Sequence, residues 1–451
     1  MALTYTLLLW ATLALLATGN AQQYPMVTSP TTALGRATAA ISALQGFYNQ
    51  TSGLWDTTGW WNSGNCLTVF ADYASIDTSY ASEARKVFAN TFERAQIQEL
   101  TIEQQISPER YAKIVQHGFR IDSPQAPTDR EKRAINSLDQ RIFFNVTNFP
   151  GFLNDFYDDE GWWALAWIRA YDVTGRTETR YLNIAISIFE DMTTGWSDGK
   201  SSKTHCEGLW WNKQQANINA IENELFLSVA AHLATRVGVL RRDYYLSWAL
   251  KEWSWFEGTG MITSRNLIND GIRLDTCKNN GETIWTYNQG VVLGALVELN
   301  KVSPNPKYIK IATSIANAAI DHFSNENGII KEICDPYCGA DGAQFKGIFV
   351  RNLYYLWEVT GQPKLLNTIT KNAESVWTND RDDQNRFGGA WYGPYIDANA
   401  GTHSSASDAI VAAAKADALK DKAPANSTGN DGVMPGIAII DGPGVAPVAT
   451  S

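Results

Sequence analysis

Three consecutive acids, Asp158, Asp159 and Glu160, stand directly before an almost wholly apolar run, GWWALAWI at 161–168. Acids in the first turn of a helix are favoured by the helix dipole and by capping, so local electrostatics could explain them. A pair of neighbouring carboxylates also has a chemical use. In glycoside hydrolysis one carboxylic acid protonates the leaving oxygen, while the other attacks the sugar or activates water. The acids alone do not separate these two interpretations.

The spacing of the two aspartates favours one kind of glycoside chemistry. Side chains of adjacent residues lie about 5 Å apart, which is the separation of retaining enzymes and too short for the water of an inverting enzyme. Charging both carboxyls at that distance is costly, so we expect one pKa to be raised. The helix start favours the ionised partner, and the aromatic neighbours Tyr157, Trp162 and Trp163 favour the neutral one.

The composition agrees with a carbohydrate-active protein. The 451 residues include 17 Trp, 18 Tyr and 17 Phe, and an excess of such rings is typical of surfaces on which sugars lie, although most of the Trp should be core. The net charge is −10 with no basic stripe, which argues against nucleic acid as a partner. The five His are isolated, without an HExxH motif, so we expect neither a metal site nor another cofactor.

The first residues predict secretion. An apolar run at 7–16 is followed by small residues, which is typical of a signal peptide over 1–21, and the run is too short to span a membrane. We therefore expect a secreted, extracellular or cell-wall protein. N-x-S/T glycosylation sequons occur at Asn49, Asn145 and Asn426.

The cysteine count fits the same compartment. Secretion favours disulfides, and an odd number of Cys leaves at least one thiol over. Cys66 lies in an apolar helical stretch, so we expect it to be the buried free thiol. The other four, Cys206, Cys277, Cys334 and Cys338, can form two bridges, and the last two are one candidate pair.

Apolar periodicity predicts an all-α protein. The twelve expected helices are 31–49, 65–77, 80–96, 161–173, 181–194, 217–237, 242–256, 285–300, 306–323, 346–360, 363–378 and 404–419. Alternate helices are apolar nearly all round, and such helices are buried on every side. Six buried helices inside six amphipathic ones make an (α/α)6 barrel.

A helix-pair repeat of about 60 residues supports this architecture. Gly175, Gly238 and Gly361 fall where a helix of each pair should end. The barrel should occupy 22–420 as one catalytic domain, interrupted by a long polar connection at 97–153.

The residues after the barrel, 421–451, are rich in Pro, Gly and Ala and predict a disordered tail. The tail ends without a hydrophobic stretch, so no GPI signal is expected. We expect a monomer.

Several expected inner helices open with polar and aromatic residues, at 61–65, 210–219, 286–289 and 345–346. In a barrel these starts can converge on the face that holds the three acids. That convergence favours a catalytic role for the acids over helix capping alone.

With these motifs in place, a family resemblance emerges. YDDEGWWALAWI at 157–168 resembles the signature of glycoside hydrolase family 76, the endo-α-1,6-mannanases. Four further motifs are similar to the family's other inner helices and come in the family's order. They are WWNSGN at 60–65, GLWWNK at 208–213 with NAIENELF at 219–226, WTYNQG at 285–290 and FKGIFVRN at 345–352.

The resemblance implies an (α/α)6 barrel that cleaves α-1,6-mannan, or the mannan of a mannoprotein glycan, with retention. It implies that Asp158 is the nucleophile and Asp159 the acid/base, and it gives Glu160 no catalytic role. The sugar contacts that it implies are Trp61, Asn65, Trp162, Trp210, Asn219, Tyr287, Asn288 and Lys346.

Two other functions stay open. Fungal members of the family are thought to be transglycosidases acting on the mannan core of GPI glycans, through the same mannosyl-enzyme. A non-catalytic mannan-binding protein is the third alternative, disfavoured because both aspartates are present. The missing GPI signal and the long connection at 97–153 depart from the family pattern and leave the biological role open.

Overall fold

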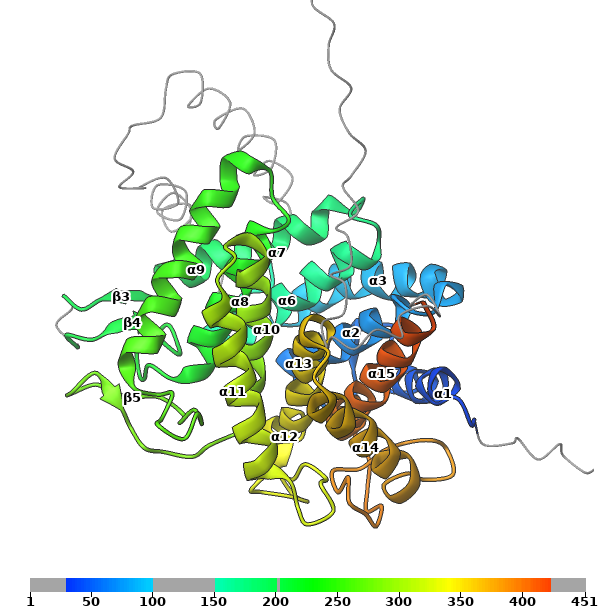
Figure 1. The fold of residues 1–451 in the computed structure, drawn as a ribbon. Helices are drawn as coiled ribbons and strands as arrows, with labels where there is room; N and C mark the ends of the chain where they lie inside the picture. Colours follow the sequence, from blue (N-terminus) through cyan, green and yellow to red (C-terminus); the bar gives the residue numbers. More distant parts are fainter. Residues whose placement is uncertain (1–29, 100–150, 201–202, 423–451) are drawn as a thin grey trace, which may run out of the picture.

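The computed structural model describes residues 30–99, 151–200 and 203–422. Within these ranges the chain is mostly helical, and a long helix lies at each of the twelve expected positions (Figure 1). The predicted signal peptide and nearly all of the predicted tail and of the 97–153 connection lie outside the described residues, as do the sequons at Asn145 and Asn426.

Six helices form a closed inner ring, in which each contacts the next and the last contacts the first. In ring order they are α2 (Trp60–Ala74), α6 (Tyr157–Val173), α8 (Ala220–Ala234), α10 (Thr286–Val302), α13 (Phe345–Thr360) and α15 (Ala400–Lys422). This is the order that the predicted (α/α)6 barrel requires.

The other six long helices alternate with the ring helices along the chain, and each packs against a ring helix. They are α1 (Ala33–Gln45), α3 (Ala81–Glu99), α7 (Thr179–Thr194), α9 (Val239–Thr259), α11 (Pro306–Phe323) and α14 (Pro363–Asn379). The burial pattern of each helix agrees with its place in the inner or the outer ring. In α8 every residue at 220–231 is buried, whereas α14 buries residues only at helical spacing, such as Leu365, Ile369 and Val376.

The connections contain only short regular elements. They are the 3-10 turn η1 (Thr78–Tyr80), the one-turn helix α12 (Gly339–Gly342), and three antiparallel ribbons, β1 (Tyr48–Asn49) with β2 (Leu54–Trp55), β3 (Trp196–Asp198) with β4 (Glu207–Leu209), and β5 (Ile272–Arg273) with β6 (Lys278–Asn279). None of the helices in the described ranges has the length and apolar character needed to cross a bilayer.

The helix-ending glycines were predicted correctly at two of three positions. Gly175 and Gly361 follow α6 and α13 with φ of 72° and 63°, the left-handed region that glycine favours. The prediction for Gly238 is wrong, because this glycine has a φ of −63° and is the N-cap of α9. The preceding helix, α8, already ends at its C-cap Thr235.

The cysteines pair as the sequence allowed. Disulfides join Cys206 to Cys277 and Cys334 to Cys338, the second being the predicted candidate pair. Cys66 is the predicted buried free thiol, inside α2. The fifth cysteine therefore belongs to the core.

Candidate active site

Asp158 lies in the first turn of α6 and is held by the loop that precedes α8. The indole Nε1–H of Trp211 donates to Asp158 Oδ2 over 3.0 Å. The backbone supports this contact, because the N–H of Tyr157 donates to the carbonyl of Trp211 over 3.0 Å. Asp158 Oδ1 is buried, and no hydrogen bond reaches it from the described residues.

The pKa of Asp158 is raised to about 6, chiefly because the carboxyl has lost solvent. The negative charge of Asp341 raises this pKa further, and the hydrogen bond from Trp211 lowers it. Asp158 is therefore a carboxyl that ionises near pH 6 and carries charge above it.

Asp159 has a different partner. Asn154 Nδ2 donates to Asp159 Oδ2 over 2.6 Å. Asn154 Oδ1 accepts the backbone N–H of Phe156 over 2.9 Å, so the chain just before α6 fixes the carboxamide. Asp158 thus accepts a hydrogen bond from an indole and Asp159 from a carboxamide. The two donors come from separate segments, so the two carboxylates have different surroundings and can have different roles.

Glu160 differs from both aspartates in being fully buried. Its Oε1 accepts from Lys213 Nζ over 2.6 Å, and the same ammonium lies 2.8 Å from Asp191 of α7. Burial raises the pKa of Glu160 well above its usual range, the nearby Asp191 raises it further, and Lys213 lowers it. Glu160 is a member of a buried charged cluster beneath the pair.

Two of the expected aromatic contacts lie beside the acids. Trp61 of α2 stacks on Trp162 of α6, with ring centroids 5.6 Å apart and planes 24° from parallel. Trp61 Nε1 donates to Asp341 Oδ1 over 3.0 Å. Because the charge of Asp341 acts on Asp158, the stacked pair lies near the carboxylates.

The start of α10 reaches the same place. Tyr287 stacks on Phe345, with centroids 3.8 Å apart, and its pKa is raised well above the usual range by burial and by the charges of Asp270 and Asp158. Asn288 is buried and donates to Asp270 Oδ1 over 3.4 Å. Asp270 is thus another carboxylate of this region, and burial raises its pKa.

The remaining expected contacts have partners within the protein. Asn219 is half-buried and forms a capping box with Glu222 at the start of α8. Trp210 and Lys346 are each only 2% exposed, which departs from the expectation that they face a sugar. Lys346 Nζ donates to a carboxylate oxygen of Asp335 and to a backbone carbonyl, so its charge is used inside the protein.

Asn65 also departs from the expectation. It is 2% exposed, and its Oδ1 accepts from Arg351 across the ring. Among the sequons the structure describes only Asn49, which is half-buried and whose Nδ2 contacts Asp56 over 3.2 Å.

Sequence reasoning missed four residues of the site. Trp211 follows Trp210 in the GLWWNK motif, so the doubled tryptophan did point to this position. Asn154 stands four residues before Asp158, a position from which an Asn often forms a local turn. Asp270 lies in a loop and Asp341 in the one-turn helix α12, and neither carried a signal in the sequence.

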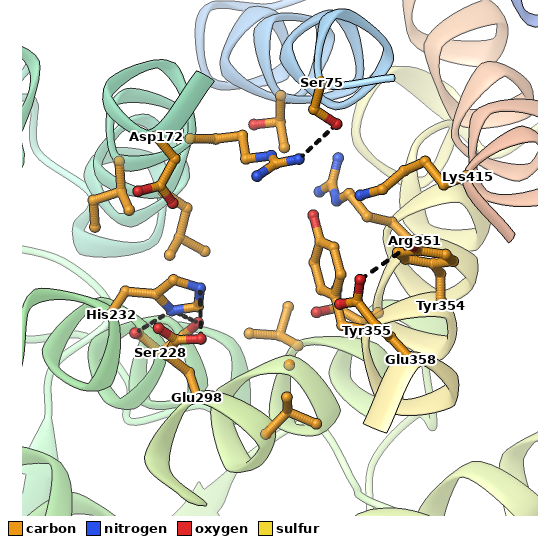
Figure 2. A pocket seen from close by; sticks show the side chains of 18 of the residues that line it. Ser75, Asp172, Ser228, His232, Glu298, Arg351, Tyr354, Tyr355, Glu358 and Lys415 are labelled. Atoms are coloured by element: carbon orange, nitrogen blue, oxygen red, sulfur yellow. Dashed lines mark hydrogen bonds and ion pairs between the residues drawn. The ribbon is translucent and has the colours of Figure 1, made fainter. Parts of the chain in front are cut away.

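The opposite end of the inner ring is closed by charges around a cavity of about 290 Å³ (Figure 2). Arg236 lies between Asp172 and Glu298 and donates to both carboxylates. Asn65 and Trp162 also line this cavity, so it extends behind the aromatic pair. These charges are paired with one another, as expected of groups that link neighbouring helices of the ring.

The described residues contain one cluster with the side chains of a metal site, formed by His205, Cys206 and Cys277. Both sulfurs belong to one disulfide, so they are not thiolates that could bind a cation. The cluster does not fit a metal.

Comparison with known proteins gives a family match. The sequence model of glycosyl hydrolase family 76 matches residues 134–428, which is more than half of the chain. The match includes α6 with its acids and every later inner helix.

Two fungal relatives are both described as mannan endo-1,6-alpha-mannosidases. The chain is 28% identical over 213 residues to mannan endo-1,6-alpha-mannosidase DCW1 of Candida albicans, covering 44% of this chain and 46% of that protein. It is 25% identical over 258 residues to DCW1 of Saccharomyces cerevisiae, covering 53% and 56%. The chain thus spans about half the length of the curated relatives it matches.

Solved structures share the fold. An inactive variant of the alpha-1,6-mannanase GH76A of Salegentibacter, in complex with alpha-1,6-mannotriose, matches with a TM-score of 0.63 at 19% identity, over 85% of this chain and 99% of that one. Dfg5 of Chaetomium thermophilum, in complex with glucosamine, matches with a TM-score of 0.62 at 18% identity, over 87% and 92%.

Proposed function

Because the chain belongs to glycosyl hydrolase family 76, we propose that it hydrolyses internal α-1,6-mannosidic linkages of mannan with retention of configuration. The observation that carries this proposal is the adjacent pair Asp158 and Asp159, whose carboxylates have separate hydrogen-bond donors. The names of the fungal relatives support the substrate class. In the related mannanase, the inactive variant carries substitutions at two consecutive aspartates.

In the first step Asp158 attacks the anomeric carbon. One carboxylate oxygen forms the bond to C1 while the bond from C1 to the glycosidic oxygen breaks, and Asp159 gives its proton to that oxygen. A shortened mannan leaves, and the other part stays on Asp158 as a mannosyl ester. Asp158 Oδ1 suits the attack, because no described residue donates a hydrogen bond to it and Trp211 holds the other oxygen.

In the second step water releases the sugar. Asp159, now a carboxylate, takes a proton from water whose oxygen bonds to C1, and the bond from C1 to Asp158 breaks. Both carboxyls return to their starting states. Two displacements at C1 give net retention.

The aromatic residues near the pair support binding of a sugar. Trp61 is half-buried on top of Trp162, and Tyr287 is half-buried against Phe345. Such rings can take the C–H face of a mannose on each side of the cleaved bond. Their support from a second ring keeps each one in place before substrate arrives.

The proposal includes a place outside the cell. Two disulfides fit an oxidising compartment, and the fungal relatives are mannan-cleaving enzymes by name. A single (α/α)6 catalytic domain over 22–420 completes the proposal.

The test is incubation with linear α-1,6-mannan, with product masses and the anomeric configuration of the first products followed in time. Shortened chains with new reducing ends, formed first as the α anomer, support the proposal. Products joined to an added short mannoside or glucan would identify a transglycosidase. Binding without any new product would replace the proposal by a mannan-binding protein.

A further inference from the structure

The third acid of the run, Glu160, occupies a position that links two segments. Its Oε1 accepts from Lys213 Nζ over 2.6 Å and from the backbone N–H of Asn154 over 2.9 Å. The ammonium also lies 2.8 Å from Asp191 and 5.4 Å from the ring centre of Tyr157. Glu160 is therefore held by Lys213 of the loop before α8, which also pairs with Asp191 of α7, and it in turn holds the backbone of Asn154 just ahead of α6.

Asn154 is constrained by three hydrogen bonds, one at its backbone N–H and two at its side-chain carboxamide. Its backbone N–H donates to Glu160, its Oδ1 accepts from Phe156 N, and its Nδ2 donates to Asp159 Oδ2 over 2.6 Å. The contact to Phe156 also fixes which end of the carboxamide carries the nitrogen. The group that meets Asp159 is thus a donor, and Glu160 holds the residue that supplies it.

We propose that Glu160 is a positioning residue, which holds Asn154 so that its carboxamide orients Asp159 for proton transfer. The inference rests on the proposed function. A carboxamide N–H at Oδ2 favours the proton of a neutral Asp159 on Oδ1, since the oxygen that accepts the hydrogen bond is the carbonyl oxygen. The linked contacts thus select the oxygen that gives the proton to the leaving group.

The three acids of the run then have different tasks. Asp158 and Asp159 react, whereas Glu160 acts through Asn154 and touches no reacting atom. Lys213 makes the arrangement possible, because a fully buried carboxylate needs a cation or a proton.

The test compares two substrates that differ in how much protonation the leaving group needs. One is an α-1,6-mannan oligosaccharide, and the other is a nitrophenyl α-1,6-mannobioside, whose leaving group departs with little help. Asn154→Ala and Glu160→Ala should each lower kcat on the oligosaccharide by about tenfold to a hundredfold and kcat on the nitrophenyl substrate by only a few-fold.

A merely structural role would lower both activities in parallel with the loss of folded protein, and that outcome overturns the proposal. Asn305→Ala is the matched control. Asn305 also accepts a backbone N–H, from Lys307 over 3.1 Å, but it caps α11 after the far end of α10. Its substitution should leave the ratio of the two activities unchanged.

Glu160→Ala removes a fully buried group and can fail to fold, so Asn154→Ala, at a half-buried position, is the deciding variant. If the wild-type chain cleaves neither substrate, the proposed function fails. If it cleaves both and Asn154→Ala keeps their ratio, only the positioning role fails.

Discussion

The indole of Trp211 donates to Asp158 across the joint between the loop before α8 and the first turn of α6. The contact joins segments 53 residues apart. The same loop also reaches the acid run through Lys213, whose ammonium donates to Glu160. The state of the proposed nucleophile therefore depends on a residue that the chain supplies from outside its own helix.

Trp211→Phe keeps a ring in place and removes this donor. The hydrogen bond lowers the pKa of Asp158, so its loss should raise that pKa above about 6. Since the nucleophile must be ionised, the acid limb of kcat/KM against pH should move to higher pH, with roughly a tenfold loss near pH 6. Trp253→Phe, in the outer helix α9, should leave the limb where it is. An unmoved limb in Trp211→Phe would contradict the role of the indole.

The two aspartates should fail in different ways. Asp158→Asn should lower kcat by several powers of ten on every substrate, because no covalent intermediate can form. Asp159→Asn should lose more on mannan than on a nitrophenyl mannobioside, because the second leaving group needs little protonation. Unfolding curves must remain close to wild type for either result to count. Near-normal mannan cleavage by Asp158→Asn would refute the proposed mechanism.

The sequence predicted all twelve long helices and the free cysteine because both depend on local patterns. An inner helix such as α8 is apolar on every side, and an outer one such as α14 has a single apolar face, so periodicity alone separates the two kinds. The adjacent aspartates were visible as candidates in one short stretch, but the polar starts of other inner helices were needed to favour a catalytic role over helix capping.

The surroundings of the proposed sugar contacts were harder to predict, because each depends on partners far away in sequence. Asn65 lies one turn after Trp61 on the same face of α2, but that turn places it about 6 Å deeper in the ring, where Arg351 meets it. In the sequence Lys346 is an unpaired cation at a helix start, but in the structure its ammonium donates to Asp335, which lies in the loop before α12. Trp211 contacts the acids and Trp210 is buried. Two adjacent tryptophans in a sequence do not show which of the two side chains faces the acids.

The two disulfides should contribute differently to stability. Cys206 and Cys277 are 71 residues apart, and Cys334 and Cys338 only four. Loop-closure entropy gives about 4 kcal/mol for the first bridge and about 2 kcal/mol for the second. Serine substitution of each pair, followed by urea unfolding, measures both losses. Equal losses would contradict the entropic account.

The short bridge should matter more for activity than for stability. It closes the loop that carries Asp335 to Lys346 and leads to Asp341, the partner of Trp61. Its removal should raise KM for mannan oligosaccharides, whereas removal of the Cys206–Cys277 bridge should leave KM nearly unchanged once the protein is folded. Initial rates measured well below the unfolding midpoint separate the two effects. A larger KM change from the long bridge would contradict this assignment.

His403 of α15 should make folding sensitive to acid. Its Nε2 contacts the carbonyl of Ala40 over 2.8 Å and its Nδ1 accepts from Phe387 N over 3.1 Å, which requires a neutral ring. Burial lowers the pKa of His403 from 6.5 to about 4. Between these values the unfolded chain binds a proton that the folded chain does not, so stability is full above pH 6.5 and falls as pH decreases toward 4.

Integrated over that window, His403 should remove about 3 kcal/mol from the free energy of unfolding, or about 1.4 kcal/mol per pH unit. His403→Gln keeps a polar group near both backbone partners but cannot take up the proton. The variant should be less stable at pH 7.5 and should show a shallower fall from pH 6.5 to pH 4. Urea unfolding of both proteins at half-unit pH steps provides the slopes. Parallel slopes would mean that the ring is protonated without penalty in the folded state, and that the contacts of its two nitrogens do not hold it neutral.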